Sequence, residues 1–153
     1  VTEIHSPLRG RVIPLEKVPD PGFASGAVGK GVAVEPTEGI VVAPENGTVA
    51  MAFETGHAIG LKLDSGVELL VHIGIDTVNM EGKGFQVHVK KGDVVTAGAP
   101  LISFDLKAIA AAGYSSITPV LVTNHRRFGA VDSVASGSVA PGAKLLKVSA
   151  KPE

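Results

Sequence analysis

Short apolar stretches separated by turn residues constrain the fold more than any other feature of this sequence. The chain has 19 glycines and 10 prolines in 153 residues, and between them run brief stretches rich in valine, isoleucine and leucine. This pattern is typical of many short strands joined by tight turns. Only the segment 106–113, in which several alanines precede Gly113, has the composition of a helix, and the glycine ends it early. We therefore predict an all-β protein, an antiparallel β-sandwich or barrel-sandwich hybrid with at most one or two short helical turns. Because no long helix is available, a βαβ nucleotide-binding fold is excluded.

Two short motifs each occur twice and predict a duplicated half. Segments Pro7–Val12 and Pro44–Val49 share the pattern Pro-x-x-Gly-x-Val, in which the glycine is expected to begin a strand. Segments Val95–Leu101 and Val139–Leu145 share the pattern Val-x-x-Gly-x-x-Leu. Short glycine motifs also recur by chance in a glycine-rich chain, but the order of these four favours two interleaved halves packed as a sandwich.

Composition and charge exclude several classes of function. With 153 residues and 44% apolar content, the chain is expected to form a single domain, residues 1–153, with a sizeable core. Its 14 basic and 15 acidic residues give a net charge of −1, so we expect no nucleic-acid partner. The chain has no cysteine, which excludes disulfides, thiol nucleophiles and cysteine–zinc sites. It has no apolar run of membrane-spanning length and no signal peptide, so we expect a cytoplasmic protein.

Two histidines, His57 and His72, flank a predicted β-hairpin, and there we place the candidate chemistry. Apolar residues run on both sides of the polar segment Asp64-Ser65-Gly66, which has the composition of a hairpin loop. If the loop has two residues, either Asp64-Ser65 or Ser65-Gly66, the two histidines face one another directly or diagonally on one face of the sheet. A three-residue loop without a bulge would place them on opposite faces. We therefore predict a two-residue loop and neighbouring imidazoles.

Neighbouring imidazoles on a rigid sheet allow three interpretations, which the spacing alone leaves open. In the first, His72 attacks a phosphoryl group with one ring nitrogen while the other donates to a backbone carbonyl, and His57 and the Thr55 hydroxyl steady the phosphoryl oxygens. In the second, both histidines bind zinc, and a carboxylate such as Glu54 or Asp76, or a partner's side chain, completes the coordination shell. In the third, both are ordinary structural histidines of a sheet.

Apolar and acidic residues near the histidine hairpin or near glycines indicate a protein partner. We expect the apolar ones to surround the site and the two aspartates to form an acidic rim, as in a docking surface. The alternative is that the apolar members belong to the core. This candidate docking surface consists of Asp20, Phe23, Val28, Phe53, Asp76 and Val78.

Two segments around the histidines have highly specific patterns. They are Phe53-Glu-Thr-Gly-His57-Ala and Gly66-Val-Glu-Leu-Leu-Val-His72-Ile-Gly-Ile-Asp-Thr-Val78. Further stretches agree with the same family, namely Pro7–Gly10, Val18–Phe23, Ala43–Gly47, Gly82–Phe85, Phe104–Asp105 and Thr118–Asn124. Over nearly its whole length, the chain resembles the glucose-type enzyme IIA of the bacterial phosphoenolpyruvate:sugar phosphotransferase system.

This resemblance implies an antiparallel β-sandwich that carries phosphohistidine and requires no cofactor. His72 would accept the phosphoryl group on Nε2 from phospho-HPr. It would then pass the group to the cysteine of a IIB domain, which phosphorylates the sugar as the membrane IIC domain imports it. His57 would be the supporting histidine, and Thr55 would hydrogen-bond to the histidine pair.

The resemblance also implies contacts with proteins and none with sugar. The candidate docking surface would receive HPr and the IIB domain, whereas the sugar would never touch this chain. Unphosphorylated members of some lineages bind and inhibit unrelated permeases and kinases. A zinc ion can bridge the two histidines, here His57 and His72, at such an interface.

Overall fold

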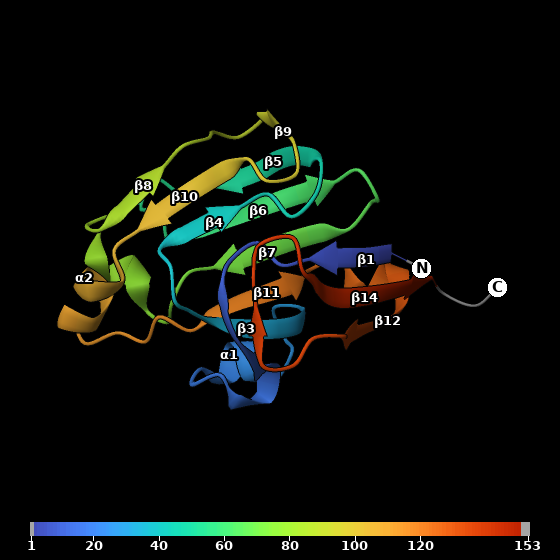
Figure 1. Cartoon of the computed structure of the whole chain (residues 1–153), viewed down its shortest axis with the longest axis horizontal. Coiled ribbons are helices and arrows are strands. Elements are labelled where there is room, and N and C mark those ends of the chain that lie inside the picture. The colour runs from blue at the N-terminus through green and yellow to red at the C-terminus, as the bar shows by residue number, and fades with distance from the viewer. Residues whose placement is uncertain (1, 151–153) are drawn as a thin grey trace.

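The computed structural model describes residues 2–150, and its largest component is an antiparallel sheet of eight strands (Figure 1). These strands are β2 (Gly10–Pro14), β3 (Lys30–Pro36), β5 (Gly47–Ala52), β6 (Ala58–Leu63), β7 (Glu68–His72), β9 (Val94–Val95), β11 (Thr118–Val122) and β13 (Ser138–Val139). Their order across the sheet is β13-β2-β3-β11-β7-β6-β5-β9. Central strands β7 and β11 therefore have hydrogen-bonded neighbours on both sides.

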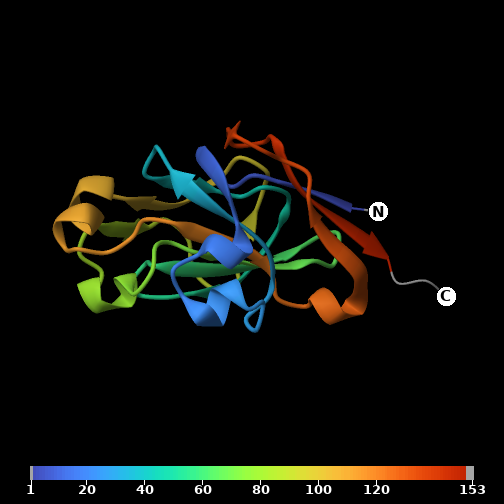
Figure 2. The same ribbon diagram turned by 90° about the horizontal axis from the view of Figure 1, so that it is seen from below.

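Two sheets of three strands complete the fold. Their strands are β1 (Thr2–His5), β4 (Ile40–Val42), β8 (Phe85–Val87), β10 (Pro100–Phe104), β12 (Phe128–Ser133) and β14 (Lys144–Ala150). One sheet has the order β4-β10-β8 and the other β1-β14-β12. Seen from below, both lie over the same face of the large sheet (Figure 2). The predicted antiparallel β-sandwich is confirmed.

The core lies between the large sheet and the two small ones. Ile59 and Val71, which pair across β6 and β7, are fully buried. They belong to the same apolar cluster as Leu101 of β10 and Leu146 of β14. Alternate residues of the strands thus point into one shared core, as the short apolar stretches of the sequence require.

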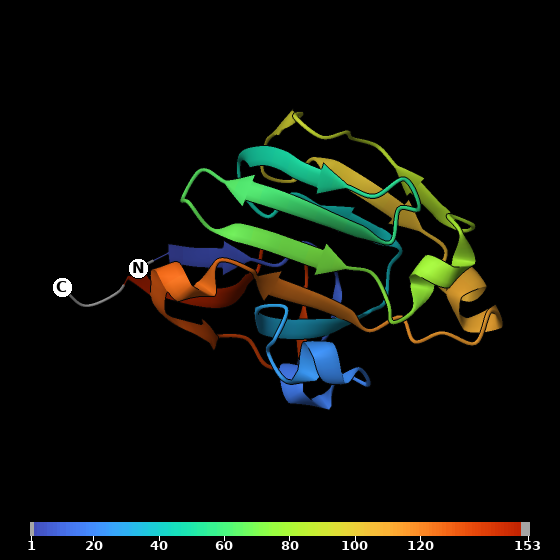
Figure 3. The same cartoon turned by 180° about the vertical axis from the view of Figure 1, so that it is seen from behind.

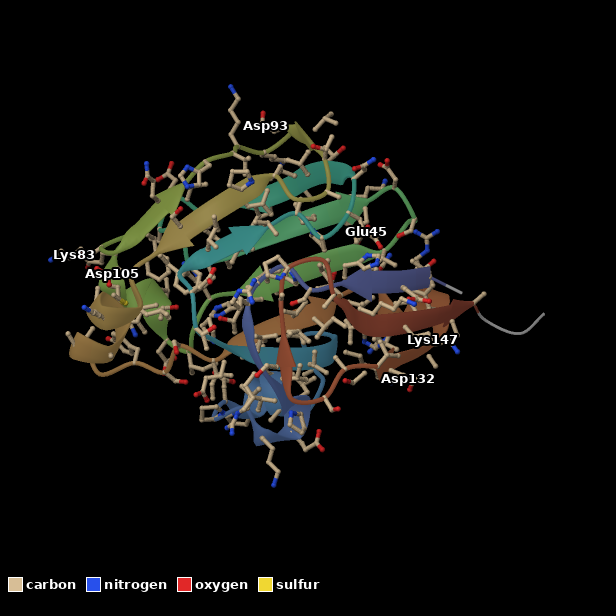
Figure 4. All side chains as sticks on the ribbon, in the orientation of Figure 1. Glu45, Lys83, Asp93, Asp105, Asp132 and Lys147 are labelled. Carbon is tan, nitrogen blue, oxygen red and sulfur yellow. The ribbon has the colours of Figure 1, made fainter. Side chains whose placement is uncertain are left out.

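In the described part of the chain, helical structure is limited to short segments. The helices are α1 (Pro21–Ala24) and α2 (Leu106–Ala111), and the 3₁₀ turns are η1 (Leu15–Lys17), η2 (Thr77–Met80) and η3 (His125–Arg127). Asp105, labelled in Figure 4, caps α2 because its side chain accepts from the backbone N–H groups of Lys107 and Ala108 at 2.9 and 3.2 Å. The predicted helix over 106–113 is confirmed, with its last helical residue at Ala111. Within residues 2–150, no helix combines the length and apolar character needed to cross a membrane.

The first repeated motif occupies equivalent places in the large sheet. Gly10 begins β2 and pairs with Val139, and Gly47 begins β5 and pairs with Val95. At both glycines an added Cβ would overlap a carbonyl oxygen of the adjacent strand. Each motif therefore has a glycine because only glycine allows the neighbouring backbone to approach so closely.

The second repeated motif forms two equivalent turns. Gly98 and Gly142 both have φ of +89°, and each lies between a strand of the large sheet and a strand of a small one. The N–H of Gly98 donates to the Ala43 carbonyl at 2.8 Å, and the N–H of Gly142 donates to the Ser6 carbonyl at 3.1 Å. Ala43 and Ser6 each precede the proline that opens the first motif. The predicted duplication is therefore present in the structure, with both halves contributing to one sandwich.

The predicted two-residue loop between β6 and β7 was wrong. Ala58 pairs with His72, and the Leu63 N–H donates to the Val67 carbonyl at 2.9 Å, which leaves three residues, Asp64-Ser65-Gly66, in the loop. Gly66 has φ of +94°, and its N–H donates to the carbonyl of Leu63 at 2.9 Å. Glycine readily adopts this left-handed conformation, so Gly66 can serve as the third residue of the loop. The composition of the loop alone does not distinguish a loop of two residues from one of three.

Candidate functional site

The imidazole rings of His57 and His72 lie side by side even though the loop has three residues. Their centroids are 5.2 Å apart and their planes are inclined by 76°. His72 is the last residue of β7, but His57 precedes β6, in a turn that contains Gly56 with φ of +72°. Since His57 lies outside the strand, its ring need not follow the strand's alternation. The predicted proximity of the two rings is confirmed. It arises because His57 lies in the turn before β6, and not because the two histidines pair across the strands as predicted.

The backbone fixes the proton on the His72 ring. His72 Nδ1 lies 2.7 Å from the carbonyl oxygen of Gly74. A carbonyl oxygen can only accept, so Nδ1 carries the hydrogen and the lone pair of Nε2 remains free. Sequence reasoning expected a carbonyl partner without naming Gly74. The only feature of the sequence that could have pointed to Gly74 is its position, two residues beyond His72 in the loop that follows β7.

Thr55 is hydrogen-bonded to His57, the other histidine of the pair. Its Oγ1 lies 2.6 Å from His57 Nδ1, so Nε2 is the ring nitrogen of His57 that remains available. His57 itself is buried, with 6% of its surface exposed, whereas His72 is half-buried. The structure therefore brings Thr55, His57 and His72 together, as the sequence predicts.

Two phenylalanines of the candidate docking surface pack against the histidine rings. Phe23 of α1 lies with its centroid 4.8 Å from that of His72, and Phe53 stacks on His57 at 5.0 Å. In Figure 3, which shows the large sheet from behind, the short blue helix α1 lies just below β3. Aromatic rings thus cover part of both imidazoles and reduce their contact with water.

Burial makes both imidazoles harder to protonate. It lowers the pKa of His57 below the ordinary 6.5, and the neighbouring His72 lowers this pKa further. Burial also lowers the pKa of His72, against the opposing effects of the Gly74 carbonyl, Asp20 and Asp76. Both rings are therefore neutral at neutral pH, which is the form that a nitrogen nucleophile requires.

Of the remaining residues of the candidate docking surface, Asp20 and Asp76 lie close enough to His72 to act on its charge, and the two valines are exposed. Asp20 caps α1 by accepting the N–H of Gly22 at 2.8 Å, and Asp76, with φ of +62°, immediately precedes η2. Val28 and Val78 are 41% and 48% exposed, and Phe53 is 39% exposed. These three apolar residues are not part of the core, so the alternative interpretation is wrong for them.

The histidine pair supplies only part of a zinc coordination shell. Within residues 2–150, no three or more His, Cys, Asp or Glu side chains are grouped closely enough to hold a metal ion. The structure therefore does not bring Glu54 or Asp76 into a ligand set with the histidines. Since zinc usually takes four ligands, at least two would have to come from outside the described residues.

Comparison with known proteins assigns the chain to a family. The family described as "phosphoenolpyruvate-dependent sugar phosphotransferase system, EIIA 1" matches residues 2–128. The chain belongs to this EIIA family. The resemblance inferred from the sequence is therefore confirmed, and the chain is a component of a phosphotransferase system.

Relatives of this EIIA chain occur both inside long proteins and as short ones. The mannose-specific EIIBCA component of Corynebacterium glutamicum is 46% identical over 153 residues, which are all of this chain but 22% of that protein. The β-glucoside-specific EIIBCA component of Bacillus subtilis is 50% identical over 146 residues, 95% of this chain and 24% of that protein. The glucose-specific EIIA component of Bacillus cereus is 44% identical over 149 residues, 97% of this chain and 90% of that protein. The EIIA chain thus spans about a quarter of the length of the EIIBCA relatives and nearly all of the short one.

A solved structure agrees with this assignment. The glucose permease IIA from Mycoplasma capricolum is similar to this EIIA chain with a TM-score of 0.85 and 34% sequence identity. The match covers 95% of this chain and 94% of that one. The two chains therefore share one fold over nearly their whole lengths.

Proposed function

We propose that this EIIA chain is a phosphohistidine carrier in which His72 is the phospho-acceptor. His72 Nε2 takes a phosphoryl group from phospho-HPr and passes it to an EIIB domain. The hydrogen bond between His72 Nδ1 and the Gly74 carbonyl carries the proposal, because it leaves the lone pair of Nε2 free to attack. Family membership and the relatives named EIIBCA support the EIIB partner.

Transfer onto His72 exchanges one phosphorus–nitrogen bond for another. The Nε2 lone pair attacks the phosphorus of the phosphohistidine donor, and the bond to the donor nitrogen breaks on the opposite side, returning its electron pair to the donor. Positive charge develops on the His72 ring, and the Gly74 carbonyl stabilises it by accepting from Nδ1–H. In the second transfer a cysteine thiolate attacks the same phosphorus, and the electron pair of the bond to Nε2 returns to His72.

His57 and Thr55 are suited to binding the phosphoryl oxygens. When the Thr55 hydroxyl donates to His57 Nδ1, the ring hydrogen of His57 lies on Nε2, which becomes a donor. This donor belongs to a ring whose centroid is 5.2 Å from that of the nucleophile. Phosphoryl transfer depends mainly on positioning and on stabilising charge on the three oxygens, so a fixed donor beside the nucleophile accelerates it.

The candidate docking surface fits a protein partner. Phe53, which stacks on His57, is exposed, and exposed Val28 and Val78 offer further apolar contact area to a partner. Asp20 and Asp76 place negative charge near His72, which favours a partner with a basic rim. Exchange of phosphoryl groups with HPr and EIIB would take place in the cytoplasm. The sugar would contact the permease domains and not this chain.

The decisive experiment is the intact mass of the protein after incubation with phosphoenolpyruvate, enzyme I and HPr. We expect one acid-labile phosphoryl group on the wild type and none on the His72→Gln variant, since glutamine offers no ring nitrogen. A wild type that stays unmodified while HPr is phosphorylated would overturn the proposal. So would a His72→Gln variant that is still modified.

Two further variants give the experiment its controls. His57→Gln should still accept the group from HPr but pass it to EIIB about a hundredfold more slowly, because the donor that stabilises the phosphoryl oxygens while the group leaves His72 is lost. His88→Gln changes an exposed histidine whose Nε2 bonds to Ser103 at 2.7 Å, and it should behave as the wild type. The metal-binding interpretation would replace the proposal if the wild type carried no phosphate and if His57→Gln and His72→Gln each abolished zinc binding.

A further inference from the structure

A single peptide group links His72 to a distant loop. The carbonyl of Gly74 accepts from His72 Nδ1 at 2.7 Å. The N–H of the same peptide group belongs to Ile75 and donates to the carbonyl of Ser115 at 3.0 Å. Hydrogen bonds on both sides of one peptide plane orient it and polarise each other. The direction of the Gly74 carbonyl is therefore fixed partly from outside the strand that carries His72.

Thr77 holds the preceding peptide group, that between Ile73 and Gly74, and packs against Gly74 itself. Its side chain is fully buried, and its hydroxyl donates to the carbonyl of Ile73. A Cβ on Gly74 would lie 2.5 Å from Thr77 Cγ2 and 2.7 Å from the Ser115 carbonyl oxygen, so the Thr77 methyl packs directly against Gly74. The N–H of Ile73 also donates to the His57 carbonyl at 2.6 Å. Ile73 is therefore held on both sides, by His57 through its N–H and by Thr77 through its carbonyl, and Gly74 follows it directly in the chain.

We propose that Thr77 is a positioning residue for His72. The hydroxyl and methyl groups of Thr77 hold the Gly74 carbonyl in line with Nδ1 of His72. The consequence for phosphoryl transfer rests on the function proposed above. A free imidazole readily carries its hydrogen on Nε2, where it would block the nucleophilic lone pair. Because Thr77 is buried and bonded to backbone, it controls this proton position without touching the phosphoryl group.

The test is Thr77→Val, which keeps the shape of the side chain and removes the hydroxyl. We expect the ¹⁵N shifts of the His72 ring in the unphosphorylated protein, above the pH at which the ring titrates, to move toward the form with hydrogen on Nε2. We also expect the initial rate of phosphorylation by phospho-HPr to fall by about tenfold, since small displacements of a reacting group are costly. Thr77→Ser retains the hydroxyl and should recover most of both properties.

A matched control separates positioning from general destabilisation. Ser6 is also fully buried and donates its hydroxyl to a backbone carbonyl, that of Leu8 at 2.7 Å. Ser6→Ala should lower the free energy of unfolding yet leave the His72 ring shifts and the rate unchanged. If Thr77→Val does not fold, Thr77→Ala removes the same hydroxyl with less crowding and should show the same two changes.

The outcomes that contradict the inference are distinct from those that contradict the proposed function. Wild-type ring shifts and a wild-type rate in a folded Thr77→Val or Thr77→Ala variant would overturn it, as would the same ring-shift change in Ser6→Ala. The ring shifts are measured before any phosphoryl donor is added. A wild type that accepts no phosphate would therefore contradict the proposed function while the positioning of His72 by Thr77 is still tested.

Discussion

At the scale of single residues, the lowered pKa values of His57 and His72 make the free energy of unfolding depend on pH. Burial lowers the pKa of both, and His72 lowers that of His57 further. As the pH falls below 6.5, the unfolded chain takes up protons at these positions, whereas the folded chain takes them up only at lower pH. Their contribution to the free energy of unfolding is thus complete above pH 6.5 and declines as the pH falls toward the lowered values. We expect the wild type to lose stability over this range in urea unfolding, and His57→Gln to lose less.

Comparing the wild type with His57→Gln removes the contribution of every other titrating group that the two proteins share. Burial raises the pKa of Glu45, labelled in Figure 4, above the ordinary 4.5, which acts in the opposite direction near that pH. This effect is present in both proteins and disappears from the difference between their stabilities. Equal pH dependence of the two proteins would show that His57 does not titrate with a lowered pKa.

At the scale of elements, the short helix α1 places Phe23 against His72. A helix of four residues has little stability of its own, so its cap and its packing hold it. Asp20 supplies the cap through the Gly22 N–H. We expect Asp20→Ala to lower the free energy of unfolding by about 1 kcal/mol, whereas Asp20→Asn, which also caps well, stays near the wild type. Urea unfolding of both variants measures this, and equal losses would assign the effect to the charge of Asp20 and not to its cap.

At the scale of the whole molecule, the duplicated halves predict matched responses to substitution. Gly10→Ala and Gly47→Ala would each drive a methyl group into a carbonyl of the adjacent strand, so both should cost about 3 kcal/mol. Gly98→Ala and Gly142→Ala meet open space and bear only the cost of a positive φ, about 1 kcal/mol each. Thermal or urea unfolding of the four variants gives the comparison. A large difference within either pair would mean that the halves are equivalent in geometry but not in energy.

Local patterns in the sequence predicted most of the fold. Glycine and proline between short apolar stretches predicted the all-β sandwich, and the alanines after Asp105 predicted α2, because turn and helix preferences act over a few residues. The repeated motifs predicted the duplication, since the same close backbone approach demands the same glycine in both halves. The matching segments around His57 and His72 identified the family and the histidine pair.

Contacts between distant segments decided the remainder. The sequence could not show that Gly66 accommodates a three-residue loop, or that His57 reaches His72 from outside its strand. Nor could it show that the Ser115 carbonyl, far along the chain, helps to orient the peptide group whose carbonyl accepts the hydrogen bond from His72 Nδ1. The sequence determined which strands, turns and reactive side chains this protein has, because those depend on neighbours along the chain. Only the tertiary structure decided the register of β6 and β7 and the full orientation of the Gly74 carbonyl, because the first depends on pairing between strands and the second partly on the hydrogen bond from the Ile75 N–H to Ser115.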